Sequence, residues 1–476
     1  MITFLICLAL LITAYFTYGR YLEKEVGVDP NLATPCKRLY DGIDYVPLPR
    51  WRVFLIQLLN IAGTGPIFGA ILGACFGPVA FLWITLGGIF MGSMHDFLSG
   101  MMLVRNDGLS IPEVVGNYLG NGMRQFMRIF SVLLLILVGA VFLLSPAQLL
   151  GNMTPAISTP VWVWIILAYY FIATLLPIDK IVGQIYPVFG IALVLMALGL
   201  MGALFFGDYT IPEMTTFHNF QLNPEKLPII PTLFITIACG AISGFHATQS
   251  PLMARCVQNE KECRSVFYGA MISESIIALV WAAVAMTFFG GAGELSQAMA
   301  NNGNSPAWAV NEISNGMLGM AGGILALLGV VAAPITSGDT AFRSARLIIA
   351  DMLHIDQRSK QKRLYICIPL FIVGYGITLV DFDVVWRYFA WTNQTLATIV
   401  LWSIVVYMVR RKANRWIAIL PAIFMTYICS SFIFISNQFL GMTNHTLAYI
   451  LGGVVALCIT AIMFHRLKSE EQTIIK

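Results

Sequence analysis

Apolar residues along this chain gather in long runs that are separated by short polar stretches. Windows of about 20 apolar residues, the length that a helix needs to cross the hydrocarbon core of a bilayer, recur along the whole sequence. They fall near residues 2–19, 52–75, 78–104, 126–150, 161–178, 183–206, 229–250, 265–290, 317–350, 364–380, 385–409, 415–436 and 446–464. The pattern predicts an all-α polytopic membrane protein with about 13 transmembrane helices, in which residues 1–476 form a single membrane domain.

The composition agrees with this pattern. Hydrophobic residues make up 58% of the chain and charged residues 11%, and the mean hydropathy is +0.79. Because soluble domains carry roughly a quarter charged residues, an ordinary soluble globular protein is excluded. The net charge of +4 gives no reason to expect a nucleic acid partner, since the orientation in the lipid bilayer accounts for where the basic residues lie.

Lysine and arginine fix the predicted orientation. With the N-terminus outside, the outer loops and helix ends carry only Lys226 and Arg387. The inner segments collect Arg20, Lys24, Lys37, Arg38, Arg50, Arg124, Arg128, Lys180, Arg255, Lys261, Arg264, Arg358, Lys360, Lys362, Arg363, Arg410, Arg411, Lys412, Arg415, Arg466 and Lys468. This split follows the positive-inside rule. It predicts an odd number of spans and a cytoplasmic C-terminus.

Two of the predicted spans contain residues that break helices. The range 52–75 is interrupted by Asn60, Gly63, Thr64, Gly65 and Pro66. The range 229–250 is interrupted from Gly240 onward by the stretch SGFHATQSP, which contains Ser243, Gly244, His246, Thr248, Gln249, Ser250 and Pro251. In hydrocarbon, backbone groups that a break frees must be satisfied by protein, water or a ligand. A kink whose polar side chains bond their own backbone is the simpler explanation for either break alone.

The two breaks occupy matching positions in two halves of opposite direction. Residues 52–206 and 229–409 form the predicted repeats of five helices each, residues 1–51 add an N-terminal helix and a cytoplasmic loop, and residues 410–476 add two accessory helices. Discontinuous helices in corresponding positions of an inverted repeat point to the binding site of a transporter at the bilayer midplane.

Other polar residues lie within predicted spans. His95 and Asp96 suit either a proton relay or a structural pair, and Glu274 suits either helix bridging or coupling. Asp339 lies one helical turn from Arg343, so it either neutralises that arginine or holds a proton or cation with Thr336 and Ser337 as oxygen ligands. The amides of Asn393 and Gln394, beside Trp391, suit either helix packing or substrate binding.

Four of these stretches carry a family resemblance. NIAGTGPIFG, SGFHATQSPLMARC, TSGDTAFRSARLI and WRYFAWTNQTLA closely resemble signature stretches of the carbon starvation A (CstA) family, and the likeness is collinear from about residue 50 to 410. The resemblance implies a bacterial inner-membrane transporter related to the amino acid–polyamine–organocation superfamily, with a leucine-transporter-like fold of five plus five helices. It further implies import of peptides or pyruvate during carbon starvation, with protons as the coupling ion.

These observations predict a proton-coupled importer of a small carboxylate, pyruvate or a short peptide, that works by alternating access. The expected substrate-binding residues are Asn60, Gly63, Thr64, Gly65, Ser243, Gly244, His246, Thr248, Gln249, Ser250, Asn393 and Gln394. The expected coupling residues are His95, Asp96, Asp339, Thr336 and Ser337, with His246 as a further carrier of the proton.

A sodium-coupled symporter, with Na⁺ near Ala62, Gly63, Thr336 and Ser337, remains open because hard cations take oxygen ligands. An ion channel also remains open, because discontinuous helices line pores as well. No enzyme activity and no cofactor are expected, since no catalytic motif lies at membrane depth.

Overall fold

The computed structural model describes residues 1–42, 44–175, 186–355, 357 and 359–475, and helices form nearly all of its regular structure. The helices of the N-terminal half are α1 (Ile2–Phe16), α2 (Tyr18–Val26), α3 (Pro35–Arg38), α4 (Arg50–Ile61), α5 (Gly65–Ala74), α6 (Val79–Leu82), η1 (Trp83–Ser93), α7 (Met94–Arg105), α8 (Ile111–Leu119), α9 (Asn121–Met153), α10 (Thr159–Leu175) and α12 (Tyr186–Phe206). No strand occurs in these described ranges.

The second half continues in the same way. Its helices are η2 (Ile229–Leu233), α13 (Phe234–Thr236), α14 (Gly244–Ala254), η3 (Glu260–Glu262), η4 (Arg264–Tyr268), α15 (Gly269–Phe288), α16 (Ala292–Asn301), α17 (Pro306–Leu325), η5 (Ala326–Val331), α18 (Ala332–Leu353), α19 (Lys360–Ile377), α20 (Phe382–Arg410), α21 (Trp416–Ile435) and α22 (His445–Ile475). The all-α class predicted from the apolar pattern is confirmed.

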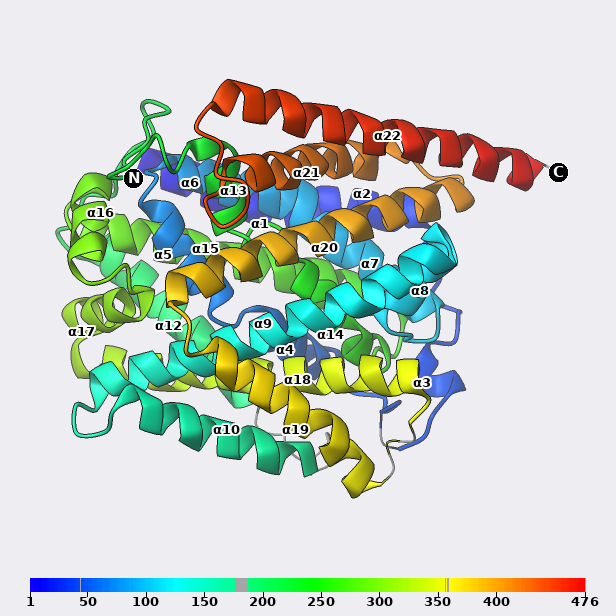
Figure 1. Ribbon diagram of the computed structural model, residues 1–476, viewed down its shortest axis with the longest axis horizontal. Coiled ribbons are helices and arrows are strands. Elements are labelled where there is room, and N and C mark those ends of the chain that lie inside the picture. The colour runs from blue at the N-terminus through cyan, green and yellow to red at the C-terminus, as the bar shows by residue number, and fades with distance from the viewer. Residues whose placement is uncertain (43, 176–185, 356, 358, 476) are drawn as a thin grey trace.

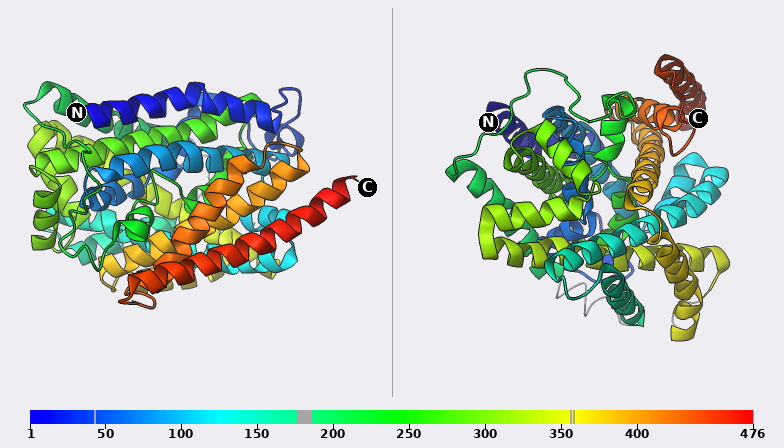
Figure 2. Two further views of the ribbon diagram at one scale, coloured as in Figure 1. Left: turned by 90° about the horizontal axis from the view of Figure 1, so that it is seen from above. Right: turned by 60° about the vertical axis from the view of Figure 1, so that its left-hand side comes forward.

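The long helices form one bundle, with α4, α9 and α14 in its middle and α10, α19 and α22 at its edges (Figures 1 and 2). Their burial follows this arrangement. The apolar window of α20 is 89% buried and that of the continuous run Glu260–Phe288 is 83% buried, whereas the window of α22 is 17% buried. Exposed leucine, isoleucine and phenylalanine side chains on the outer helices are what a bilayer requires, because lipid replaces protein as their partner.

Nine helices in the described part of the chain are long and apolar enough to cross a membrane, and the bent pair α4–α5 brings the number to ten. Helix α10 is apolar but shorter, and the range 229–254 is divided into pieces. The structure therefore establishes a multi-pass membrane protein, while the number of 13 spans stays a prediction. Lys180, Arg358 and the adjoining ends of the predicted ranges 161–178 and 183–206 lie outside the described residues.

The first predicted break is present. Helix α4 ends at Ile61, α5 starts at Gly65, and the two helices are bent by 48° across residues 62–64, which we call break 1. Pro66 stands in the first turn of α5. A proline is tolerated there because its missing N–H has no partner inside the helix anyway.

The second break lies earlier in the chain than the sequence suggested. The helical turns of α13 end at Thr236 and α14 starts at Gly244, so the interruption, break 2, covers residues 237–243. The expectation that residues 243–250 are themselves unwound is wrong beyond Ser243. Gly240 has φ of +93°, a conformation that favours glycine, and Ser243 is extended, whereas Pro251 lies inside α14 without ending it.

Candidate functional site

The start of α5, directly after break 1, packs against break 2. A Cβ atom added to Gly65 would lie 2.4 Å from both Cβ and Sγ of Cys239, and one added to Gly240 would lie 3.9 Å from Cα of Pro66. Contacts this close are possible only because Gly65 carries no side chain. The two interruptions, far apart in sequence, therefore share one location inside the bundle.

Side chains from neighbouring helices satisfy the backbone groups that break 2 frees. The indole Nε1 of Trp83 donates to the carbonyl of Ile237 (3.0 Å), and Nε2 of Gln394 donates to the carbonyl of Phe234 (3.1 Å). At the start of α14, Oδ1 of Asn393 accepts from the backbone N–H of Phe245 (2.6 Å). Break 2 is thus held open by specific partners, as a non-helical segment at membrane depth requires.

Four ionisable side chains form a continuous buried chain beside break 2. Nδ1 of His95 lies 2.8 Å from Oδ1 of Asp96, and Oδ2 of Asp96 lies 2.8 Å from Nδ1 of His246. Nε2 of His246 then lies 3.3 Å from Oε2 of Glu274. All four side chains are fully buried, and they come from α7, α14 and α15. We call this set the His–Asp–His–Glu chain.

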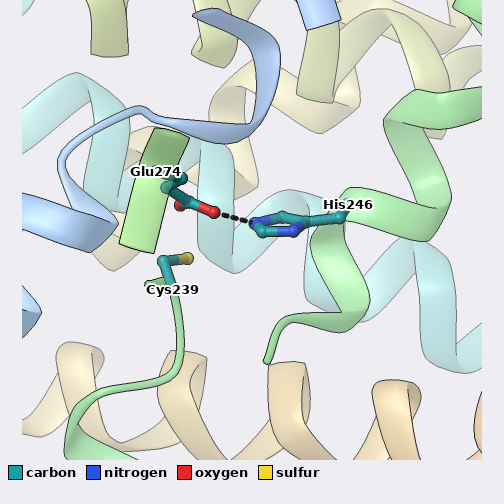
Figure 3. Close-up of side chains that lie close together, drawn as sticks. All are labelled: Cys239, His246 and Glu274. Carbon is teal, nitrogen blue, oxygen red and sulfur yellow. Dashed lines mark ion pairs between the residues drawn. The ribbon is translucent and has the colours of Figure 1, made fainter. Parts of the chain in front are cut away.

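Figure 3 shows the far end of this chain together with Cys239, which extends from break 2 toward His246 and Glu274. The chain contains two imidazoles and two carboxylates, so its net charge depends on how many protons it holds. Two hydrogen bonds join the first three members, and His246 and Glu274 are within ion-pair distance. Ionisable residues that pair with one another inside a membrane mark proton relays in pumps and transporters. The two His–Asp contacts and the His–Glu contact give a proton adjacent positions along the chain.

Break 1 has a different lining, made of neutral groups. Within the described residues, neither Oδ1 nor Nδ2 of Asn60 has a hydrogen-bond partner, although the side chain is fully buried. The hydroxyl of Thr64 accepts a bond from Ser145 (3.4 Å). Gly63 lies against the ring of Phe142, where an added Cβ would be 2.6 Å from Cζ. A buried amide that lacks partners indicates a place for a ligand or water.

The other polar residues of α14 mostly bond within the bundle. Thr248 donates to the carbonyl of Phe245 (2.6 Å), and Ser250 donates to the carbonyl of His246 (2.9 Å). Nε2 of Gln57 on α4 donates to Ser250 (3.1 Å), which ties the helix before break 1 to α14. Nε2 of Gln249 donates to Thr248, and its Oε1 has no partner in the described part of the chain. Ser243 and Asn393 bond each other, with Gly244 packed beside them.

The residues expected on α18 divide into two groups. Ser337 donates to the carbonyl of Leu59 (3.0 Å), three residues before Ala62 in break 1, and Thr336 donates to the carbonyl of Ala333 (2.7 Å). Asp339 pairs with Arg343 across 3.5 Å, the ion pair that their spacing allows. Arg343 also donates to the carbonyl of Ala173 (3.2 Å). Asp339 therefore has a partner on its own helix, away from the His–Asp–His–Glu chain.

A cavity of about 170 Å³ lies beside the two broken helices. Its walls come from α5, the segment 221–236, α16 and α20, and they include Arg387 and Asp383 of α20. Next to this cavity, α5 packs closely against the carbonyl of Thr236 at Gly69. A Cβ atom added to Gly69 would lie 3.1 Å from the carbonyl oxygen of Thr236.

The family described as "Carbon starvation protein CstA" matches residues 1–159, 147–324 and 290–431 of this chain. The chain belongs to the CstA family. An uncharacterised membrane protein of Haemophilus influenzae is 43% identical over 340 residues, which covers 61% of this chain and 91% of that protein. The family membership confirms the resemblance carried by the four sequence stretches.

Two characterised relatives of this CstA-family chain are transporters of Escherichia coli. The peptide transporter CstA is 26% identical over 58% of this chain and 48% of its own length, and the pyruvate/proton symporter BtsT is 28% identical over 56% and 46%. The chain spans about half the length of both proteins. Their matches support a secondary transporter rather than an enzyme.

A solved structure shows the same fold. MhsT in complex with L-phenylalanine superimposes with a TM-score of 0.54 at 13% identity, over 88% of this chain and 98% of MhsT. At that identity the likeness concerns the fold alone, and it shows that the CstA-family chain adopts the architecture of a known transporter.

Sequence reasoning missed the way in which the polar residues combine. From the sequence, His95–Asp96 and His246 are alternative proton carriers, Glu274 has a bridging or coupling role and Cys239 has no assigned role, yet the structure joins all five. Nothing in the local sequence links positions 150 residues apart. The available signal was the direction of the spans, since an imidazole and two carboxylates at similar depth in neighbouring helices must find partners.

Proposed function

We propose that this protein is a proton-coupled secondary transporter that imports a small carboxylate, pyruvate or a short peptide, by alternating access. The family membership and the transporter fold support the transporter class. The names of the two Escherichia coli relatives support peptide and pyruvate as substrate classes, and one of them supports protons as the coupling ion.

The observation that carries this proposal is the fully buried His–Asp–His–Glu chain against break 2. Its central member, His246, stands in the first turn of α14, three residues after Ser243 ends the break. Any rearrangement of break 2 therefore changes the contacts of His246 with Asp96 and Glu274. Protonation of the chain and the position of the broken helix are coupled for that reason, which is what proton-driven alternating access requires.

In this proposal the substrate binds where the two breaks touch. Asn60, whose two side-chain amide atoms have no hydrogen-bond partner in the described residues, supplies donor and acceptor, and the positive dipole ends at the N-termini of α5 and α14 favour a carboxylate. Thr64, Gln249 and Ser250 complete the polar lining. The cavity that contains Arg387 is the route by which an anionic substrate approaches.

The proposed membrane topology has 13 spans with the N-terminus outside and the C-terminus in the cytoplasm. Residues 52–206 and 229–409 form the two inverted repeats, and the spans that contain the breaks rock together with the spans that follow them. The membrane is the bacterial inner membrane.

The proposal is tested with purified protein in liposomes under an imposed pH gradient. Labelled pyruvate and labelled dipeptides are offered separately, and His246→Ala is compared with the wild type and with His218→Ala, which alters an exposed histidine. Wild type and His218→Ala should accumulate one of the two substrates, while folded His246→Ala should not. Accumulation by His246→Ala equal to that of the wild type would remove the His–Asp–His–Glu chain from coupling.

Sodium coupling is the second candidate, favoured by one contact. The bond from Ser337 to the carbonyl of Leu59 places a hydroxyl next to break 1, where Ala62, Gly63 and Thr336 offer further oxygens. Uptake that persists with a sodium gradient and no pH gradient, and that is lost in Ser337→Ala, would establish this candidate instead.

A further inference from the structure

Cys239, His246 and Glu274 bring a sulfur, a nitrogen and an oxygen donor together at break 2. Their ligand atoms all lie within 4.8 Å of one another, and all three side chains are buried (Figure 3). This is the one group of at least three histidine, cysteine or acidic side chains in the described residues whose geometry suits a metal ion.

The distances suit a small tetrahedral ion. Bonds of about 2.0–2.3 Å in a tetrahedral zinc site place neighbouring ligand atoms about 3.3–3.8 Å apart. The separation of Nε2 of His246 from Oε2 of Glu274 is 3.3 Å, and Sγ of Cys239 lies within 4.8 Å of both atoms. Cys239 stands on the non-helical segment of break 2, so a movement of its side chain toward the other two atoms would complete three ligands.

The surroundings of His246 add independent support. Its other ring nitrogen, Nδ1, lies 2.8 Å from Oδ2 of Asp96, and Asp96 is held in turn by Nδ1 of His95. A carboxylate that orients a histidine from the side opposite the metal is the usual second shell of zinc sites. Nε2 of His246 and both carboxylate oxygens of Glu274 are buried without a hydrogen-bond partner in the described part of the chain, so three potential ligand atoms of the cluster are available.

The donor types select the metal. Na⁺, Mg²⁺ and Ca²⁺ prefer oxygen ligands, whereas a thiolate ligand favours Zn²⁺ and similar borderline transition-metal ions. A thiolate from Cys239 and a carboxylate from Glu274 together balance the two positive charges of such an ion. Three protein ligands leave the fourth position of a tetrahedron open.

We propose that Cys239, His246 and Glu274 form a binding site for Zn²⁺ or a similar transition-metal ion, and that a bound ion blocks transport by fastening break 2 to α14 and α15. The ion would join the non-helical segment to two helices that must be free to separate from it. The blocking half of this inference rests on the proposed function, whereas the binding half rests on geometry alone.

Binding is tested with Co²⁺, which substitutes for Zn²⁺ and reports its ligands by absorption. Tag-free protein in detergent is stripped with a chelator and titrated with CoCl₂. We expect a thiolate-to-cobalt charge-transfer band and visible bands of tetrahedral Co²⁺, both removed by added Zn²⁺. The bands should be absent in Cys239→Ala and weakened or shifted in Glu274→Gln, and they should persist in Cys263→Ala, which changes another fully buried cysteine.

The outcomes separate the two halves. Absence of the bands in folded wild type, or their persistence in folded Cys239→Ala, overturns the site whatever the protein transports. Inhibition is measured in liposomes: Zn²⁺ should reduce wild-type uptake at least tenfold, a chelator should restore it, and Cys263→Ala should behave like the wild type. Cobalt bands together with uptake that Zn²⁺ leaves unchanged would overturn the block and retain the site.

Discussion

Break 1 and break 2 each interrupt a predicted span and meet at Gly65, yet they differ in what surrounds them. Break 1 spans three residues and is lined by neutral groups, among them the partnerless amide of Asn60. Break 2 spans seven residues, and the fully buried His–Asp–His–Glu chain and Cys239 lie against it.

Under the proposed function, this difference divides the tasks of substrate recognition and proton coupling between the two breaks. Neutral donors and acceptors recognise a substrate without changing charge, whereas histidines and carboxylates change charge when a proton arrives. Because the breaks share one location, the proposed proton at break 2 and the proposed substrate at break 1 would act on the same two helices. Each prediction below tests this division.

The largest effect is expected from Asp96→Asn. Asp96 is the only member of the chain that contacts both histidines, so its replacement leaves the buried His95 without its anionic partner and His246 with Glu274 alone. Removing one partner of a buried ion pair costs about 3–5 kcal/mol. Accumulation driven by a pH gradient should be abolished, as measured by labelled substrate in liposomes.

Asp339→Asn is the matched comparison, because Asp339 is also a buried aspartate but pairs with Arg343 on α18. It should retain pH-driven accumulation. The reverse result, with Asp339→Asn inactive and Asp96→Asn active, would move the coupling group away from break 2.

Gly65→Ala should come next in size. The new methyl group would lie 2.4 Å from Cβ and Sγ of Cys239, so the two breaks would have to separate. Inserting a methyl group into a close-packed interior typically costs about 1–3 kcal/mol. We expect uptake to fall at least tenfold in protein that still elutes as a monodisperse species.

Gly122→Ala provides its control, since an added Cβ at this position of α9 meets nothing within 4 Å. Its uptake should equal that of the wild type. Equal uptake by both variants would show that the contact between the breaks is not required for transport.

Asn60→Ala should have a smaller effect and of a different kind. Loss of a hydrogen bond between uncharged groups costs about 0.5–1.5 kcal/mol, which corresponds to an increase in KM of up to about tenfold. The dependence of uptake on the pH gradient should be unchanged, because the Asn60 side chain makes no hydrogen bond to the His–Asp–His–Glu chain in the described residues. A variant that loses this dependence while KM stays constant would contradict the division of tasks.

The sequence was sufficient for the class of fold and for the presence of both breaks, for reasons that are local. Long apolar runs and residues such as Gly63 and Pro66 act on their own segment of backbone. It misplaced break 2, because the interruption covers residues 237–243 with Gly240, at φ of +93°, in its middle, whereas the sequence indicated an interruption from Gly240 to Pro251. A proline in an established helix does not always end that helix.

The assembly of the candidate site could not be read in the same way. Asp96 meets His246, and His246 meets Glu274, only after three helices pack. Gly92 shows how narrow that packing is, since an added Cβ there would lie 2.2 Å from the carbonyl oxygen of Ala241 in break 2. Such contacts depend on the tertiary arrangement of backbone segments, which no local pattern specifies.

The smallest effect is expected from Asn393→Ala, which tests how break 2 is held open. Oδ1 of Asn393 on α20 accepts a hydrogen bond from the N–H of Phe245 in the first turn of α14. A side chain at the start of the same helix normally accepts such a bond, whereas here the acceptor belongs to a different helix. Loss of a helix cap costs about 1 kcal/mol. The apparent melting temperature in detergent should therefore fall by a few degrees, and uptake should decrease only in part.

Asn315→Ala, which removes an exposed amide bonded to Asn311, should leave both quantities unchanged. If Asn393→Ala melts like the wild type, the end of break 2 does not depend on α20, and the polar groups of break 2 itself must stabilise the start of α14.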